Sequence, residues 1–147
     1  MFFTKRLIPK KEERAIVQAI AKAELLTSGE IRVHIEKVCE DENPLSRAVA
    51  IFNAIGMYET AQRNGVLIYI ALKSRKFAII GDIGINKVIP DNFWNEVRNS
   101  LGKHLANGEV EKGVVEAIAQ TGKILQSKFP YLEGDINEQS DEISYGK

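Results

Sequence analysis

Three short turn motifs of the sequence contain polar residues that are able to do chemistry together. Glu30 ends the first motif (27–30), Arg63 and Asn64 lie in the second (62–65), and Asp82 lies in the third (81–84). Carboxylate and amide oxygens are ligands that Ca²⁺ and Mg²⁺ prefer, and a guanidinium can bind a phosphate through two parallel hydrogen bonds. If the four residues meet, they suit a divalent-cation site in which Arg63 binds a phosphate. The alternative, which spacing alone favours, is structural: the carboxylates accept hydrogen bonds from loop amides, and Arg63 pairs with one of them.

The elements around these motifs would bring them to one edge of a sheet. Apolar residues alternate with polar ones over 31–36, residues 66–72 form a continuous apolar run, and a second buried run covers 77–80. A helix predicted from Asn43-Pro44 joins the first two strands, which are therefore expected to be parallel. The short turn 73–76 makes the last two an antiparallel hairpin. The starts of the first two strands and the end of the third then lie together.

Helices are predicted on both sides of this sheet. Apolar residues recur at helical spacing over 10–27, after Pro44, after Pro90 and from 109 to 129. The expected class is α/β, a three-layer α/β/α sandwich with a small mixed sheet of three to four strands flanked by helices. Trp94 falls on an apolar helix stripe and is predicted to be core. His34, on the polar side of the first strand, and His104 are predicted to be surface histidines.

Composition excludes several classes of protein. The chain has 147 residues, 44% of them hydrophobic, and its 20 basic and 20 acidic residues cancel, which argues against a nucleic-acid partner held by bulk charge. The longest apolar run, residues 66–72, is far shorter than the roughly 20 residues of a membrane-spanning helix, so no integral membrane segment is expected. The start lacks the pattern of a signal peptide, and Cys39 is the single cysteine. The expected location is cytoplasmic.

The zero net charge conceals an asymmetry between the body and the tail. Residues 131–147 hold five acidic residues and one basic residue, so residues 1–130 carry a net charge of +4. We expect one α/β/α domain over 1–130 and an acidic C-terminal tail over 131–147. Electrostatic attraction would make the tail pack partly on the domain.

Three strings resemble the TPM domain family, which takes its name from a thylakoid acid phosphatase, a photosystem repair protein and a receptor-modulating membrane protein. They are Thr-Ser-Gly-Glu-Ile-Arg-Val (27–33), Arg-Asn-Gly-Val-Leu-Ile-Tyr (63–69) and Gly-Asp-Ile-Gly-Ile-Asn (81–86). The resemblance implies an α/β/α sandwich, a divalent-metal site and, in some members, phosphatase activity. It extends to the tail, and the oxygen-bearing residues that match are the expected metal ligands: Glu30, Asn64, Asp82, Asp135, Asn137 and Glu138.

Two functions are therefore expected from the sequence. The first is a TPM-type domain that binds Ca²⁺ or Mg²⁺ and acts as a binding or assembly module. The alternative is a metal-dependent acid phosphatase acting on phosphomonoesters, with Asp82 and Arg63 as catalytic candidates. The expected partners are the metal ion and either a phosphorylated ligand or another protein.

Overall fold

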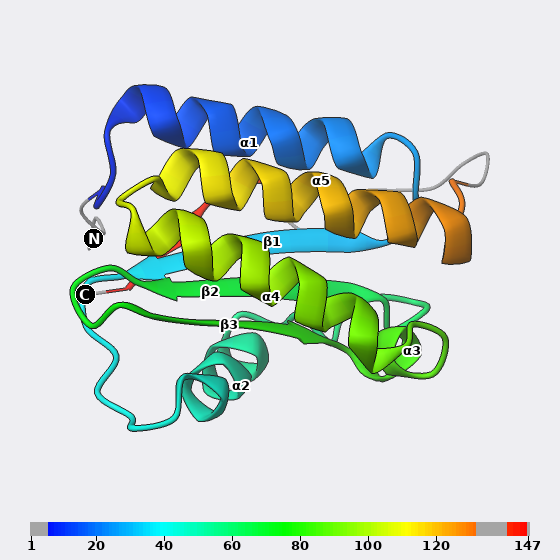
Figure 1. Ribbon diagram of the computed structural model, residues 1–147. Helices are drawn as coiled ribbons and strands as arrows, with labels where there is room; N and C mark the ends of the chain where they lie inside the picture. Colours follow the sequence, from blue (N-terminus) through cyan, green and yellow to red (C-terminus); the bar gives the residue numbers. More distant parts are fainter. Residues whose placement is uncertain (1–5, 132–140, 147) are drawn as a thin grey trace, which may run out of the picture.

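The fold was obtained as a computed structural model, and it describes residues 6–131 and 141–146. Figure 1 shows a sheet with helices on both sides, which confirms the predicted α/β/α sandwich. Along the chain the elements are α1 (Lys10–Glu24), β1 (Glu30–Glu36), α2 (Pro44–Ala54), β2 (Gly65–Ala71), β3 (Lys76–Gly81), α3 (Ile83–Asn86), α4 (Asp91–Ala106), α5 (Val110–Lys128) and β4 (Ser144–Tyr145).

The four strands form one mixed sheet in the order β3-β2-β1-β4. β1 runs parallel to β2 and β4, and β2 and β3 form the antiparallel hairpin that the short turn predicted. The register pairs Glu30 with Gly65 and Val66 with Gly81. The starts of β1 and β2 and the end of β3 therefore lie at one edge of the sheet, where the three turn motifs meet.

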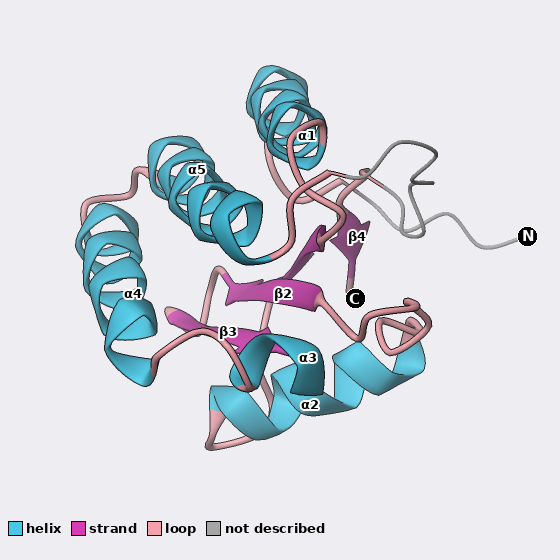
Figure 2. Cartoon of the chain, turned by 90° about the vertical axis from the view of Figure 1, so that its right-hand side faces the viewer, coloured by secondary structure: helices cyan, strands magenta, loops and turns pink. Residues whose placement is uncertain are grey.

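Helices cover the two faces of the sheet unequally. α1, α4 and α5 pack on one face and α2 lies on the other, as Figure 2 shows, while the short α3 lies at the end of β3 and adds its buried Ile85 to the core on the α4 side. α5 packs closely on both of its neighbours. A Cβ at Gly122 would lie 2.8 Å from the Cβ of Ala23 in α1, and a Cβ at Gly113 would lie 2.7 Å from the Cβ of His104 in α4. None of the described helices is long and apolar enough to cross a membrane.

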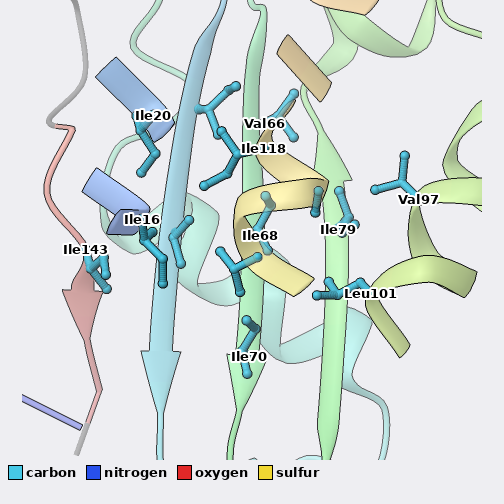
Figure 3. Packing of buried hydrophobic residues seen from close by; sticks show 14 of the residues in the cluster. Ile16, Ile20, Val66, Ile68, Ile70, Ile79, Val97, Leu101, Ile118 and Ile143 are labelled. Atoms are coloured by element: carbon cyan, nitrogen blue, oxygen red, sulfur yellow. The ribbon is translucent and has the colours of Figure 1, made fainter. Parts of the chain in front are cut away.

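Strand alternation divides the core into two clusters. In β1 and β2 the residues on one face pack against α1, α4 and α5 (Figure 3), and they are Ile31, Val33, Ile35, Val66, Ile68 and Ile70. On the other face of β2, Leu67, Tyr69 and Ala71 pack against α2. Every residue of β2 is buried, as its continuous apolar run indicated. Each large aliphatic side chain buried in this way contributes about 1.5 to 3 kcal/mol to folding.

Two short elements were not predicted. α3 has only four residues and begins where the Asp82 side chain accepts a hydrogen bond from the Ile83 N–H, so it is too short to produce a helical periodicity. β4 has two residues, Ser144 and Tyr145, and it comes from the acidic tail. It pairs with His34 and Ile35 at the outer edge of β1.

The prediction that His34 is a surface histidine is wrong. His34 and Glu36 are only 6% and 2% exposed. β4 covers the edge of the strand beside them, while Arg47 from α2 and Tyr69 from β2 bond to Glu36. Alternation in a sequence identifies the polar face of a strand, but it does not reveal that distant polar residues will cover that face.

Candidate functional site

Arg63 and Asp82 form a bidentate ion pair at the sheet edge. Arg63 Nε lies 2.6 Å from Asp82 Oδ2, and Arg63 Nη2 lies 2.8 Å from Oδ1. Asp82 is buried, and its Oδ1 also accepts a hydrogen bond from the Ile83 N–H at 2.8 Å. The hydrogen bond to Asp82 raises the pKa of Arg63 above its ordinary value. Both carboxylate oxygens of Asp82 thus have protein donors, which is the arrangement that the structural alternative described.

Backbone contacts hold the second and third motifs against each other. The Gly84 N–H donates to the carbonyl oxygen of Arg63 at 2.9 Å, and the Asp82 N–H donates to that of Gly65 at 2.9 Å. A Cβ at Gly84 would lie 2.2 Å from the carbonyl oxygen of Gln62, which no side chain tolerates. The glycine of the third motif is therefore required by this close approach of two backbones.

Glu30 and Asn64 are buried beside this pair, at 2% and 1% exposure. The Glu30 N–H donates to the Asn64 carbonyl oxygen at 3.2 Å, which ties the first motif to the second. The Asn64 side chain donates through Nδ2 to Ser28 Oγ at 3.4 Å. Asn64 Oδ1 is buried and has no hydrogen-bond partner among residues 6–131 and 141–146. A buried amide oxygen without a donor is costly, and a cation or water would satisfy it.

Glu24, the last residue of α1, was not predicted as a site residue. Its Oε2 accepts a hydrogen bond from the Ile31 N–H at 2.7 Å, which places the carboxyl group beside the start of β1. Burial raises the pKa of Glu24 to about 11, and the carboxyl groups of Asp141 and Glu30 add to this effect. Glu24 is therefore neutral at pH 7. The sequence feature that could have identified Glu24 is its position, because a carboxylate is disfavoured in the last turn of a helix unless it has another role.

Oxygen-bearing side chains of the kind that bind hard divalent cations gather at this edge. Glu24, Glu30 and Asp141 interact electrostatically, and Asn64 Oδ1 adds a neutral oxygen donor. Within the described part of the chain, no group of three or more His, Cys, Asp or Glu residues is arranged to hold an ion. The other predicted ligands, Asp135, Asn137 and Glu138, lie outside the described residues.

A second buried polar cluster, also not predicted, lies toward the end of β1. The Glu36 carboxylate accepts two hydrogen bonds from Arg47 at 2.9 Å and one from the Tyr69 hydroxyl at 2.5 Å. Burial alone would raise the pKa of Glu36, but these hydrogen bonds lower it. Burial lowers the pKa of His34, whose Nδ1 lies 2.8 Å from Ser144 Oγ. A cavity of about 490 Å³ lies against this cluster.

The prediction of a core role is confirmed for Trp94, which is 6% exposed. His104 lies partly exposed between α4 and α5, with Glu109 and Glu116 at 3.1 and 2.8 Å from its ring nitrogens. These two carboxylates raise its pKa. His104 thus links α4 to α5 through both carboxylates, away from the edge where the motifs meet.

Comparison with known proteins gives a family and a fold. A family model described as the TPM domain matches residues 3–124. The NMR structure of BA42 protein from the psychrophilic bacterium Bizionia argentinensis is similar, with 41% identity, a TM-score of 0.89, and coverage of 99% of this chain and 100% of that one.

Two other solved structures show the fold alone. The N-terminal domain of cg2496 protein from Corynebacterium glutamicum has 16% identity and a TM-score of 0.65, covering 90% of this chain and 85% of that one. The N-terminal domain of a protein from P. gingivalis has 15% identity and a TM-score of 0.66, covering 84% and 79%. No curated protein matches this chain.

Proposed function

Because this chain belongs to the TPM domain family, we propose that it is a divalent-cation-binding module and that Ca²⁺ or Mg²⁺ binds at the sheet edge beside Glu24 and Glu30. Asp141 and the amide oxygen of Asn64 are the further donors that we assign from the described residues. Asp135, Asn137 and Glu138 remain predicted ligands from the tail. Asp82 lies at the same edge but is bound to Arg63.

The observations that carry this proposal are the buried amide oxygen of Asn64, which has no partner among the described residues, and the part-buried carboxyl group of Glu24, whose Oε2 accepts a hydrogen bond from the Ile31 N–H at 2.7 Å. The pKa of Glu24 is raised to about 11 because burial and the neighbouring Asp141 and Glu30 disfavour a further negative charge. A divalent cation reverses this preference, since ligands must be deprotonated and the ion supplies the compensating charge. We therefore expect cation binding to release the Glu24 proton.

Binding an ion here would join parts of the chain that are far apart in sequence. Glu24 ends α1, Glu30 begins β1, and Asp141 precedes β4. An ion held by the Asn64 amide oxygen and two of these carboxylates would stabilise the fold and, where Asp141 is one of the two, the docking of residues 141–146 as well. This is the behaviour of a binding or assembly module whose shape depends on the ion.

The alternative, a metal-dependent phosphatase, receives no specific support from the contacts of Arg63. Both Nε and Nη2 donate to Asp82, so a phosphate would have to displace a buried carboxylate to be clamped. For this reason we rank cation binding first.

The proposal is tested by calorimetric titration of the chain with CaCl₂ and with MgCl₂ in two buffers of different ionisation enthalpy. We expect saturable binding with release of about one proton per ion near pH 7. Amide NMR in the same titration should shift the signals of Glu24, Glu30 and Asn64. Absence of binding at millimolar concentrations of both ions would refute the proposal.

Matched variants identify the carboxyl group that is involved. Glu24→Gln should weaken binding and abolish proton release, whereas Glu96→Gln, on the exposed face of α4, should leave both unchanged. Proton release that persists in Glu24→Gln would assign the proton to another group and contradict the role proposed for Glu24. A phosphomonoester assay with and without the ion, repeated on Arg63→Gln, separates the alternative, because only a phosphatase would lose ion-dependent turnover.

A further inference from the structure

A serine, a histidine and a glutamate lie in a row toward the carboxyl end of β1. Ser144 Oγ lies 2.8 Å from His34 Nδ1, and His34 Nε2 lies 3.4 Å from Glu36 Oε1. A hydroxyl beside a base that is itself oriented by a third group is the arrangement of an activated nucleophile, and its contacts are often long before a substrate binds. This row lies toward the other end of β1 from Glu30 and the proposed cation.

The contacts determine which nitrogen of the histidine has the proton. Glu36 is ionised, because its pKa stays low despite its burial where Arg47 and Tyr69 donate hydrogen bonds to it. His34 Nε2 must therefore donate to this carboxylate. Burial lowers the pKa of His34, so its ring is neutral at pH 7 and has no second proton. Nδ1 is then an acceptor, and the Ser144 hydroxyl donates to it.

The chain around Glu36 holds this carboxylate in place. Arg47 donates to both of its oxygens at 2.9 Å. A Cβ at Gly146 would overlap the Glu36 side chain, so the backbone that follows Ser144 passes directly over the carboxylate. Glu36 is therefore a positioning residue, which fixes the ring of His34 without touching the nucleophile.

A cavity of about 490 Å³, within the size range of ligand pockets, opens beside this row. It is lined by His34 and Glu36 and by Tyr145 and Gly146, the residues that follow the partly exposed Ser144. The cavity lies at the carboxyl ends of β1 and β4, which are adjacent and parallel. α2 follows β1 on one face of the sheet, and α4 and α5 precede β4 on the other (Figure 2). Ligands of open α/β sheets bind at such a point.

We propose that Ser144, His34 and Glu36 hydrolyse a carboxylic ester bound in this cavity. Ser144 Oγ attacks the acyl carbon and passes its proton to His34 Nδ1, while an electron pair of the carbonyl moves onto its oxygen. When the ester C–O bond breaks, the leaving alcohol takes the proton from Nδ1 and the acyl group stays on Ser144. A water molecule then gives a proton to Nδ1 and attacks the acyl group, and this proton returns to Ser144 Oγ as the carboxylic acid leaves.

The backbone provides a donor for the negative charge that develops on the carbonyl oxygen. Because the Gly146 N–H donates to the Ile35 carbonyl oxygen, the alternation of the parallel ladder turns the Tyr145 N–H away from β1. This N–H directly follows Ser144 in the chain. It is the donor that we assign to the oxyanion.

The charges around the cavity select the class of ester. The ionised side chains that line it are those of Glu36, Glu40, Asp41 and Arg47, three acidic and one basic, so their net charge is −2. The charge of Arg47 is paired with Glu36, whereas Glu40 and Asp41 are exposed. An ester with a cationic group is therefore attracted, and an anionic ester is repelled.

The nucleophile is tested with an alkyl fluorophosphonate, which phosphonylates an activated serine with loss of fluoride, in EDTA. Peptide mass spectrometry of the wild-type chain should find the label on Ser144. Ser144→Ala should remain unlabelled, whereas Ser127→Ala, on the exposed part of α5, should be labelled like wild type. His34→Gln retains the serine and should be labelled at least about a hundredfold more slowly. Absence of label on wild type, label on another residue, or an unchanged rate in His34→Gln would overturn the proposal.

Turnover is measured in EDTA with p-nitrophenyl esters of acetate, hemisuccinate and 4-(trimethylammonio)butyrate, which are neutral, anionic and cationic. kcat/KM should be highest for the cationic ester and lowest for the anionic ester, and Ser144→Ala should lower all three at least about a hundredfold. Glu40→Gln/Asp41→Asn should reduce the preference for the cationic ester. Equal turnover by wild type and Ser144→Ala would overturn the site, and any other order of the esters would overturn the substrate class. The label on wild type decides the role of Ser144 even if a variant loses the pairing of β4.

Discussion

Replacing Glu24 with glutamine should stabilise the protein at neutral pH. In the folded chain this carboxyl group is protonated, because burial raises its pKa to about 11, whereas its ordinary value is 4.5. Folding at pH 7 therefore takes up a proton at this residue, which has a free-energy cost. Glutamine keeps the oxygen that accepts the Ile31 N–H bond and needs no proton.

The size of the effect follows from the two pKa values. Between the unfolded pKa of 4.5 and the folded pKa of about 11, the folded state binds more protons than the unfolded state. The contribution of Glu24 to stability therefore falls as pH rises above 4.5. Each pH unit amounts to about 1.4 kcal/mol, and pH 7 lies about 2.5 units above the unfolded value. Glu24→Gln should thus raise the free energy of unfolding by up to about 3 kcal/mol at pH 7, and by little near pH 4.5.

Urea unfolding followed by circular dichroism measures this difference. Wild type, Glu24→Gln and the control Glu96→Gln would be compared in EDTA between pH 4.5 and 8. The advantage of Glu24→Gln should grow with pH at a slope of about 1.4 kcal/mol per unit, while the control follows wild type.

Two results would refute the reasoning. A difference that does not vary with pH would mean that Glu24 has the same protonation in both states. A variant less stable than wild type at pH 7 would mean that Glu24 is ionised in the folded protein, and the charge argument for the cation site would fail with it.

Three further changes test other parts of the fold. Arg47→Met leaves the buried Glu36 carboxylate without two of its hydrogen-bond donors. It should lower the free energy of unfolding, measured in urea, by about 2 kcal/mol, which is less than the usual cost of breaking a buried ion pair because the Arg47 side chain is 39% exposed. Unchanged stability would show that water replaces the donors. Gly84→Ala places a Cβ 2.2 Å from the carbonyl oxygen of Gln62 and should lower the free energy of unfolding by more than about 2 kcal/mol, which calorimetry would detect as a lower Tm. An unaltered Tm would mean that the two backbone segments can move apart at no cost. Burial lowers the pKa of His34 in the folded state, so the unfolded chain binds more protons and the free energy of unfolding should fall as pH drops through about 6.5. If the free energies of unfolding of wild type and His34→Gln differ by the same amount at every pH from 7.5 to 5, this prediction is wrong.

The order of the main elements could be predicted from periodicity and turn residues. The continuous apolar run in β2 indicated a strand covered on both faces, and the short turn before β3 indicated a hairpin; both are confirmed. α3 and β4 were missed because four and two residues are too few to show a period. Such elements form only where distant residues already provide hydrogen-bond partners.

The candidate site could be predicted only in outline. The topology argument brought Glu30, Arg63, Asn64 and Asp82 to one edge, but it could not decide which of them would bond to one another. The bidentate pair of Arg63 with Asp82 depends on side-chain geometry that spacing does not encode. Glu24 was overlooked because it lies in the polar pattern of α1, and its burial becomes visible only when Asp141 and β1 are placed around it.

The pairing of β4 with β1 has a consequence for the order in which the protein is assembled during translation. His34 and Ser144 are 110 residues apart in the chain. At the usual speed of a ribosome, on the order of ten seconds separate their synthesis. During that interval the outer edge of β1 is open, and His34 lacks its contact with Ser144. A nascent chain therefore has an open edge at β1, in addition to the outer edge of β3, and the finished protein covers the first of these with β4.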